Sequence, residues 1–477
     1  MITFYISMSL LFILICVIII RTINFKENFQ SHPKHKVKLD EAHAIESLKA
    51  MIKFKTISHV DPSKIDNVPF EMFIEYLMQR YKTVVKHAEI IRIEPMGLIF
   101  KIKGDAHEHP TVLMSHFDVV PENGLWEHDP FLGEIIEGYI YGRGTLDTKG
   151  TLCAVMESVE HHLKKLYTFK EDLYLCFSGD EEVYGKSAHN MVAYLDKHHI
   201  KPALVLDEGG AVVKDIFPNV KESIAVIGIS EKGVLSLKLT ASSSGGHAAM
   251  PPKDTPITQL SKAVVKLNQS KHFKLTLTES VYAMFDTVAR YSKSFIIRMI
   301  FANLWVFSPL VKQMASRSGG ELLSLMKTTQ AFTMMEGSEA INVLPTKASV
   351  GINYRLLTNQ TGEKTIQSIK KIINNDHIQV NTLYLSDPPS LSKRDLNYQK
   401  IVDTIYETFE ETIPTPYLMM ATTDSRHYHK ISENVYRFSP MRLSKEGLKT
   451  IHGVNEKIHK DDFIECVKFY INLLKKL

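Results

Sequence analysis

Cysteine is scarce in this chain, which has four cysteines among 477 residues: Cys16, Cys153, Cys176 and Cys466. They are far apart and form no C-x-x-C pair, so the sequence indicates neither a disulfide framework nor a zinc knuckle. An excess of one charge is also missing, because the formal net charge is only +4. No run of Lys and Arg is interleaved with aromatic residues, and we therefore expect no nucleic-acid partner.

Long hydrophobic runs are rare, but one stands at the N-terminus, where residues 2–20 carry no charged side chain. As a helix they would reach about 28 Å, close to the hydrocarbon thickness of a bilayer. The length favours a retained signal anchor. A cleaved signal peptide is the alternative, although a basic start and an A-x-A-like cleavage site are missing. We assign residues 1–22 to this segment and residues 23–40 to a polar stalk.

The localisation that follows depends on these two alternatives. A retained segment predicts a protein held in the membrane through residues 2–20. A cleaved segment predicts a secreted or vacuolar-lumenal protein. The membrane topology stays open, because only Arg21 and Lys26 follow the segment closely and two charges do not decide it.

From residue 41 onward, helical periodicity alternates with short apolar runs. The runs at 111–120, 172–179 and 202–210 are typical of strands buried on both faces of a parallel sheet. Residues 151–166, between two of these runs, form an amphipathic helical pattern. This alternation predicts a doubly wound, mostly parallel α/β domain, which binds its ligands beyond the carboxyl ends of the strands.

The pattern changes near residue 229, where apolar and polar residues alternate as in half-exposed antiparallel strands. We predict a smaller inserted α+β domain at 229–356, between the two parts of the α/β domain at 41–228 and 357–477. Two domains also suit a chain of 477 residues. Residues 294–314 are strongly apolar, but Arg298, Pro309 and Lys312 argue against a membrane span. An interior helix is favoured over an apolar wall facing the substrate.

Five potential metal ligands lie mostly at the ends of the predicted strands: His116, Asp147, Glu182, Asp207 and His452. Imidazole and carboxylate ligands suit zinc, with manganese or cobalt as substitutes. Each motif alone is weak evidence, since an H-x-D or Glu-Glu pair is commonly a solvated surface feature. It is the whole set, placed at one sheet edge, that predicts a site for two ions.

Two further carboxylates give this predicted site a chemistry. Asp118 lies two residues after His116, so both side chains point the same way and Asp118 can fix the imidazole tautomer. Glu181 adjoins Glu182 and is free to take a proton from water. The set therefore predicts hydrolysis by metal-activated water.

From about residue 41 to the C-terminus, the chain resembles the dizinc aminoacylase/carboxypeptidase family, metallopeptidase family M20. The motifs that carry the resemblance occur in order: SHFDVVP, GRGTLDTKG, SGDEEVYG, LDEGG, GGHAAMPP, NVLP and IHGVNE. SEKG, FANLWVFSPLVK, TTDSRHY and RFSPMRL resemble the branch of vacuolar carboxypeptidase S and the N-fatty-acyl-amino-acid synthase/hydrolases.

The resemblance implies a role for each matching residue. His116 and Asp207 would bind one zinc ion, Glu182 and His452 the other, and Asp147 would bridge the two. Asp118 would orient His116, and Glu181 would be the general base and then the general acid. His247 would stabilise the oxyanion, reaching in from a partner subunit. Asn342 and Arg355 would bind the carboxylate of the substrate, a role that suits the bidentate pairing of arginine.

The resemblance also implies a ferredoxin-like inserted domain that acts as a lid and forms a homodimer. The expected reaction is hydrolysis of an amide next to a free carboxylate, in a short peptide or an N-acyl amino acid. The reverse condensation and the choice of substrate stay open. The alternative is a non-catalytic, membrane-anchored binding module on the same scaffold, which predicts missing ligands or a missing base.

Overall fold

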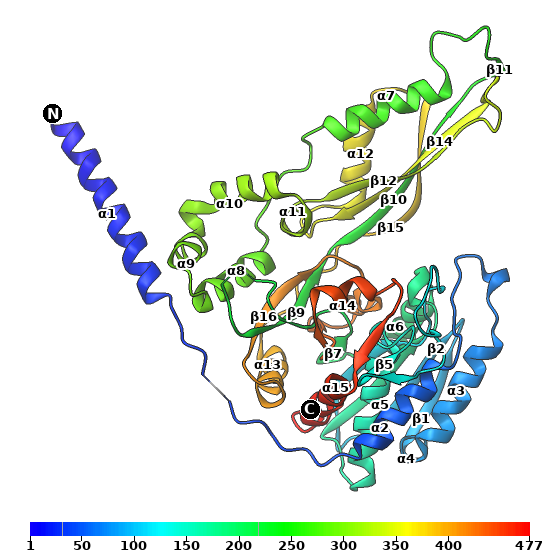
Figure 1. Cartoon of the computed structure of the whole chain (residues 1–477), viewed down its shortest axis with the longest axis vertical. Coiled ribbons are helices and arrows are strands. Elements are labelled where there is room, and N and C mark those ends of the chain that lie inside the picture. Colours follow the sequence, from blue (N-terminus) through cyan, green and yellow to red (C-terminus); the bar gives the residue numbers. More distant parts are fainter. Residues whose placement is uncertain (31, 218) are drawn as a thin grey trace.

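The computed structural model describes residues 1–30, 32–217 and 219–477. Its larger part is built on a sheet of ten strands, most of them paired in parallel (Figure 1). The sheet order is β1 (Ala88–Ile93), β2 (Gly97–Ile102), β6 (Glu171–Ser178), β3 (Ala106–His116), β7 (Leu204–Asp207), β17 (Val435–Arg437), β9 (Ser223–Glu231), β8 (Val212–Val213) and β18 (Arg442–Leu443), with β16 (Thr412–Met419) also paired to β9.

Helices cover both faces of this sheet, because its strands are apolar on both sides. One face packs against α2 (Glu41–Ile52), α5 (Lys149–Lys164), α13 (Leu396–Thr408) and α15 (Lys460–Leu474). The other packs against α6 (Ser187–Lys197) and the 3-10 turn η3 (Asp424–Lys430). Strands from both parts of the chain share the sheet, and the predicted doubly wound α/β fold is confirmed.

A separate sheet of four antiparallel strands forms the smaller part, at the top of Figure 1. Its order is β12 (Thr329–Glu336), β14 (Lys347–Leu356), β10 (Gly233–Ser242) and β15 (Ile378–Ser386), with α7 (Pro256–Gln269) and α12 (Gly362–Ile373) packed on it. This strand order, with one helix after β10 and one after β14, is that of a ferredoxin-like fold. We call this part the lid.

The lid sheet extends beyond the boundary that we predicted at residue 356. β15 pairs with β10 along its whole length and ends at Ser386. The alternation of exposed and buried residues in β15 is irregular, so the sequence did not distinguish it from the resumed α/β pattern. The division into domains remains a prediction, with the second part of the α/β domain starting after β15.

Four helices lie between α7 and β12: α8 (Glu279–Tyr291), α9 (Phe295–Ala302), α10 (Leu304–Ser318) and α11 (Gly320–Met326). Their buried side chains join the core of the larger part, not that of the lid. The predicted interior helix at 294–314 is corrected by this arrangement. Two helices meet there at an angle of 109°, and much of their apolar surface is exposed.

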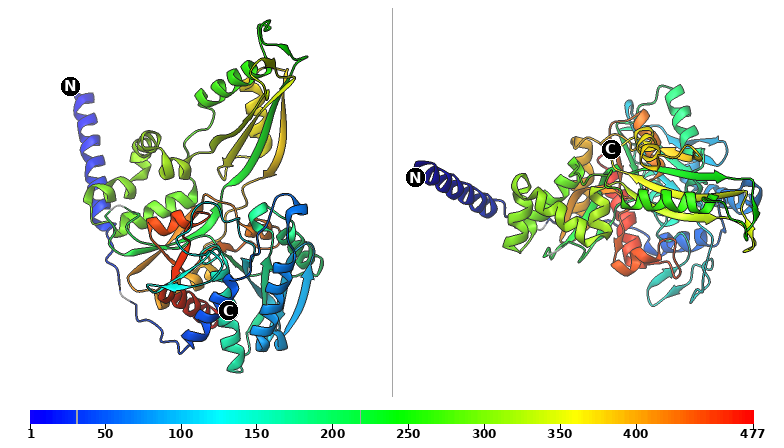
Figure 2. Two further views of the ribbon diagram at one scale, coloured as in Figure 1. Left: turned by 45° about the vertical axis from the view of Figure 1, so that its right-hand side comes forward. Right: turned by 90° about the horizontal axis from the view of Figure 1, so that it is seen from above.

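The N-terminal apolar segment forms the helix α1 (Ile2–Asn24), which extends away from the rest of the molecule (Figures 1 and 2). Within the described part of the chain, α1 is the one unbroken helix with the length and hydropathy of a membrane span. A signal sequence has the same properties, so both alternatives for this segment remain.

Candidate metal centre

The predicted ligands come from the ends of strands and from the turns and loops that connect elements. His116 is the last residue of β3, and Glu182 lies in the 3-10 turn η2 (Glu181–Val183) after β6. Asp147 lies in the turn before α5. His452 arrives from a loop after α14 (Lys445–Thr450), far along the chain. The edge of the sheet therefore collects side chains from both parts of the α/β fold.

Two clusters of potential ligands share the carboxylate of Asp147. In the first, His116 Nε2 lies 3.1 Å from Asp147 Oδ1 and 3.2 Å from Glu208 Oε1. In the second, His452 Nε2 lies 2.9 Å from Asp147 Oδ2 and 3.0 Å from Glu182 Oε2. Each oxygen of Asp147 thus belongs to a different cluster, which is the arrangement expected of a carboxylate that bridges two ions.

Asp207, which we predicted as a ligand, is not a member of either cluster. Its carboxylate accepts hydrogen bonds from the backbone N–H groups of Glu208 and Ser425, at 2.9 and 3.0 Å. The next residue, Glu208, occupies the position that we had given to Asp207. The longer glutamate side chain reaches the cluster from beyond the end of β7, whereas Asp207 still belongs to that strand. In the sequence, the only indication of a role for Glu208 was that it directly follows the predicted ligand Asp207.

Asp118 connects the first cluster to the predicted base. His116 Nδ1 lies 3.0 Å from the backbone carbonyl oxygen of Asp118 and 3.2 Å from Asp118 Oδ1, so the backbone and the side chain of Asp118 together fix the imidazole tautomer. The same carboxylate accepts hydrogen bonds from the backbone N–H groups of Glu181 and Glu182, at 3.2 and 3.1 Å. Asp118 is fully buried. It therefore holds η2, and with it Glu181 and Glu182, against the imidazole of His116.

Glu456 was not singled out from the sequence, although it ends the IHGVNE motif. It is fully buried, and Oε1 accepts hydrogen bonds from the backbone N–H groups of Gly144, Leu146 and Asp147, at 3.0, 2.8 and 3.2 Å. Its other oxygen pairs with Arg143 Nη1 at 2.7 Å, and Arg143 Nη2 donates to the carbonyl of Gly453. These bonds lock the turn that carries Asp147 onto the loop that carries His452.

The clusters hold more negative than positive charge away from water, and the pKa values of their groups reflect this. Burial raises the pKa of Glu182 to about 7 and that of Glu208 to about 8, with Asp147 adding to both. Hydrogen bonds to Asp147 and Glu182 raise the pKa of His452 to about 10. Among the described residues, the buried Oε1 of Glu182 has no hydrogen-bond partner. Bound divalent cations would balance the excess negative charge, lower the raised pKa values of the carboxyl groups and give the Oε1 of Glu182 a partner.

Glu181 lies beside the clusters without being part of them. Burial raises the pKa of its carboxyl group well above the usual range. The next side chain after η2, Tyr184, stacks on Tyr384 of the lid strand β15, with ring centroids 4.8 Å apart. Arg426 Nη2 donates to the hydroxyl of Tyr384 at 3.4 Å. The lid and the larger part therefore touch close to Glu181.

His247 and Asn342 lie together but away from the clusters. His247 is exposed in β11 (Gly246–His247), and the carbonyl of Asn342 accepts a hydrogen bond from Ala248 beside it. Figure 1 shows β11 at the end of the lid that is remote from the large sheet. Arg355 lies near the opposite end of β14, paired with Val234 at the start of β10. Within one chain, neither His247 nor Asn342 meets the predicted ligands.

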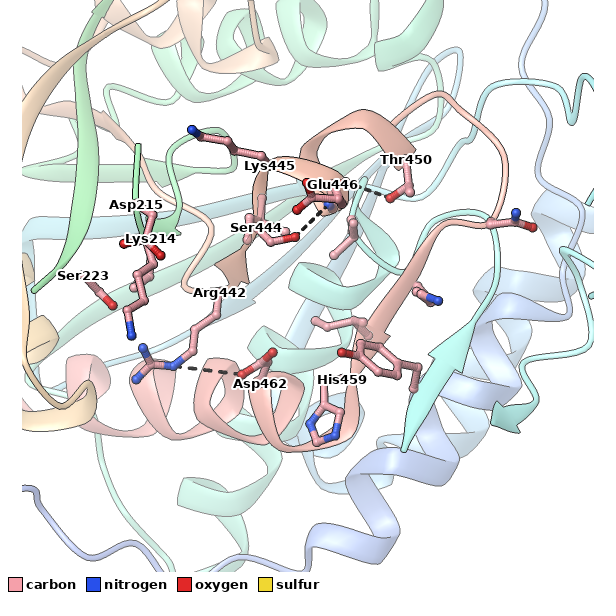
Figure 3. A pocket seen from close by; sticks show the side chains of 18 of the residues that line it. Lys214, Asp215, Ser223, Arg442, Ser444, Lys445, Glu446, Thr450, His459 and Asp462 are labelled. Carbon is pink, nitrogen blue, oxygen red and sulfur yellow. Dashed lines mark hydrogen bonds and ion pairs between the residues drawn. The ribbon is translucent and has the colours of Figure 1, made fainter. Parts of the chain in front are cut away.

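A cavity of about 730 Å³ lies near β8, β18 and α15, and none of the predicted ligands lines it (Figure 3). Figure 3 shows Lys214, Arg442 and Lys445 at this cavity, together with Asp462. Arg442 Nε donates to Glu465 at 2.6 Å and lies 4.0 Å from Asp462, so its charge is already balanced. This cavity is therefore separate from the two clusters of potential ligands.

The model of Peptidase family M20/M25/M40 matches residues 112–476, which include every residue of the two clusters. The chain belongs to this family. This M20 peptidase is 34% identical over 88% of its length to "Probable carboxypeptidase S-like 2" of Dictyostelium discoideum, and covers 82% of it. It is 32% identical over 98% of its length to "N-fatty-acyl-amino acid synthase/hydrolase PM20D1" of Xenopus tropicalis, and covers 93% of it.

Solved structures confirm the fold of the M20 peptidase. A metallo-carboxypeptidase of the family from Sulfolobus solfataricus superposes with a TM-score of 0.66, at 18% identity, over 92% of this chain and 99% of the other. A Bacillus subtilis protein described as a dinuclear metal-binding peptidase of the family superposes with a TM-score of 0.55, at 11% identity, over 91% and 98% of the two chains.

Proposed function

We propose that this M20 peptidase hydrolyses an amide bond next to a free carboxylate, with two zinc ions as cofactors. The observation that carries the proposal is the Asp147 carboxylate, whose two oxygens belong to different ligand clusters beside Glu181. His116 and Glu208 would hold one ion, Glu182 and His452 the other, and Asp147 both. Bound zinc would supply Lewis acidity towards the scissile carbonyl and towards water.

The residues of the chain divide the remaining work. Glu181 accepts the proton of the attacking water on its carboxylate and delivers it to the nitrogen of the leaving amine. Burial raises the pKa of the Glu181 carboxyl group, which favours the protonated form that returns the proton to the leaving amine. Asp118 keeps His116 in one tautomer and holds the backbone of Glu181 in place.

The substrate that we propose is a short peptide cut at its C-terminal residue, or an N-acyl amino acid. The first is supported by the relatives named carboxypeptidase S-like, and the second by those named N-fatty-acyl-amino acid synthase/hydrolase. Arg355 would pair with the substrate carboxylate. His247 and Asn342 would reach the substrate from a second copy of the chain, in a homodimer formed through the lid. Their position away from their own clusters supports this assignment.

We also propose that α1 anchors the protein in a membrane. Its 23 residues have a mean hydropathy of 2.7 over the best window, and nearly all of them are exposed. The anchor is independent of the chemistry, because α1 contributes no residue to the two clusters.

The variant Glu181→Gln tests the proposed chemistry. It should abolish hydrolysis of Gly-Xaa dipeptides and N-acyl amino acids by the zinc-loaded protein, while zinc content stays near the wild-type value. The exposed Glu108→Gln should leave turnover unchanged and serves as the matched control. Full activity in the Glu181 variant would disprove its role as the base. A zinc content well below one ion per wild-type chain would instead favour the non-catalytic binding module.

A further inference from the structure

The helices α9 and α10 form an exposed apolar elbow, bent by 109° at Asn303. We call residues 295–318 the α9–α10 elbow. One side of the elbow is fixed to the protein, because Leu304 and Val311 are buried in the core of the larger part. The other side is open: Ile296 is 64% exposed and Trp305 is 55% exposed. Further exposed apolar residues of the elbow are Phe295, Leu310 and Met314.

The elbow is attached to the last turns of α1. Arg21 Nε donates to the carbonyl of Ala302 at 2.8 Å, and Asn303 Nδ2 donates to the hydroxyl of Thr22 at 3.1 Å. Ile18 and Thr22 are the two buried residues of α1. Figures 1 and 2 show α9 beside the end of α1 that is nearest to the body of the protein. The position of the elbow is therefore tied to the C-terminal end of α1.

The charge of this region is strongly asymmetric. Residues 287–320 contain no Asp or Glu, but they contain five basic residues: Arg290, Lys293, Arg298, Lys312 and Arg317. Arg290 is paired with Asp286 and Glu27, and Arg298 is buried, so the other three supply the basic flank. Apolar side chains with tryptophan on one face and a basic flank are typical of helices that lie in the interface of a bilayer. Tryptophan itself prefers the headgroup level of a membrane.

We propose that the α9–α10 elbow is a second membrane contact, which lies in the headgroup region beside α1 and prefers anionic lipid. The proposal rests on the α1 anchor of the proposed function, and goes beyond it. A span of about 20 apolar residues brings the end of α1 to the membrane surface. The elbow, bonded to that end, would then lie at the same surface, where its exposed apolar side chains can enter the headgroup region. The two contacts together would fix how the catalytic part stands on the membrane, because α8 joins the elbow to β16.

Trp305 provides a direct test, since the chain has only one other tryptophan, Trp126. The full chain is reconstituted in vesicles of phosphatidylcholine with and without phosphatidylserine, using lipids brominated either near the headgroup or near the end of the acyl chain. The fluorescence that Trp305→Phe removes is the Trp305 component. We expect shallow bromines to quench it about twofold more strongly than deep ones, and phosphatidylserine to increase the quenching.

A reporter in α1 separates the elbow from the anchor. In Phe12→Trp, the added emission should be quenched by deep bromines. If this reporter is quenched and Trp305 is not, the elbow contact is disproved and the anchor stands. If neither is quenched, both are disproved, whereas zinc content and hydrolysis of dissolved substrates still test the proposed chemistry. Stronger quenching of Trp305 by deep bromines would indicate a broken span and would also disprove the interfacial contact.

A charged substitution on the open face supplies a second measurement. Ile296→Glu should raise the accessibility of Trp305 to acrylamide in vesicles, because a buried carboxylate in the interface is unfavourable. Leu166→Glu, at an exposed leucine of the larger part, should not change it and is the matched control. Equal accessibility in wild type and Ile296→Glu would contradict the proposal.

Discussion

Asp118 shows how much of the centre depends on a single side chain. Its two carboxylate oxygens face the His116 imidazole and the backbone N–H groups of Glu181 and Glu182. The carboxylate is fully buried, so each of these interactions is made without competition from water. Asp118 therefore couples the orientation of a ligand to the position of the base.

The adjacent residues Asp207 and Glu208 should respond differently to removal of their charge. Glu208→Gln should lower the metal content of the purified protein towards one ion per chain, because a neutral amide is a poorer ligand. Asp207→Asn should keep the wild-type metal content, because Asp207 belongs to neither cluster and the amide oxygen can still accept one of its two backbone hydrogen bonds. Metal analysis of the two variants decides between the residues, and loss of metal in Asp207→Asn alone would reverse the assignment.

His429 should make the stability of the fold depend on pH. Burial and the neighbouring Arg437, whose Nη2 lies 3.2 Å from His429 Nε2, lower the pKa of His429 to about 3. The unfolded chain takes up a proton near the ordinary histidine pKa of about 6.5 and the folded chain does not, so stability falls as pH falls through this window. His429→Gln should reduce the slope of the free energy of unfolding by up to about 1.4 kcal/mol per pH unit.

Denaturant titrations between pH 7 and pH 4 measure this slope. The exposed His109→Gln removes a histidine without removing the contact to Arg437, and it is the control. An unchanged slope in His429→Gln would show that this histidine does not stay neutral in the folded protein.

At the scale of elements, two loops from distant parts of the sequence each supply a ligand to the centre. The turn before α5 supplies Asp147, and the loop after α14 supplies His452. Glu456 and Arg143 bond these loops to each other without touching either imidazole. The Arg143–Glu456 ion pair, whose side chains are not themselves in the clusters, thus sets the position of the Asp147 carboxylate.

Loss of the Glu456 carboxylate should therefore cost both stability and metal. Glu456→Ala leaves Arg143 and three backbone N–H groups without their acceptor, and breaking such a buried pair costs about 3–5 kcal/mol. Urea unfolding and metal analysis measure the two effects. Glu465→Ala, which removes a partly exposed partner of Arg442, should cost about 1 kcal/mol or less and is the control. Equal costs in the two variants would contradict the role of Glu456.

The sequence correctly predicted elements whose hydrophobic pattern has a single explanation, such as burial on both faces of a sheet. The buried stretches of β3 and β6 are recognisable because residues 112–114 and 173–177 are all apolar, and polar side chains follow at the ends of both strands. It did not predict β15, whose exposed positions follow no regular alternation, nor which of two adjacent carboxylates reaches the cluster. The sequence placed helix α9 in the interior because its residues are apolar. An apolar sequence shows that a segment avoids water, but it does not show whether protein or another apolar surface covers it.

At the scale of the molecule, metal binding should stabilise the whole larger part. The clusters join β3, η2, the turn before α5 and the loop after α14, so bound ions cross-link both parts of the α/β fold. A ligand present at about 1,000 times its dissociation constant adds about 4 kcal/mol. Removal of metal with a chelator should lower the thermal midpoint, and added zinc should restore it. An unchanged midpoint, with metal loss verified, would show that the bound ions do not stabilise the folded state, and would contradict this expectation.

The loop that carries His452 also sets an order of events during synthesis. Chains emerge N-terminus first, so α1 is available to the membrane machinery long before His452 exists. Until that histidine arrives, the cluster that it shares with Asp147 and Glu182 lacks its imidazole. With α1 as the proposed anchor, insertion into the membrane would precede completion of this cluster, so the cluster could bind its ion only afterwards.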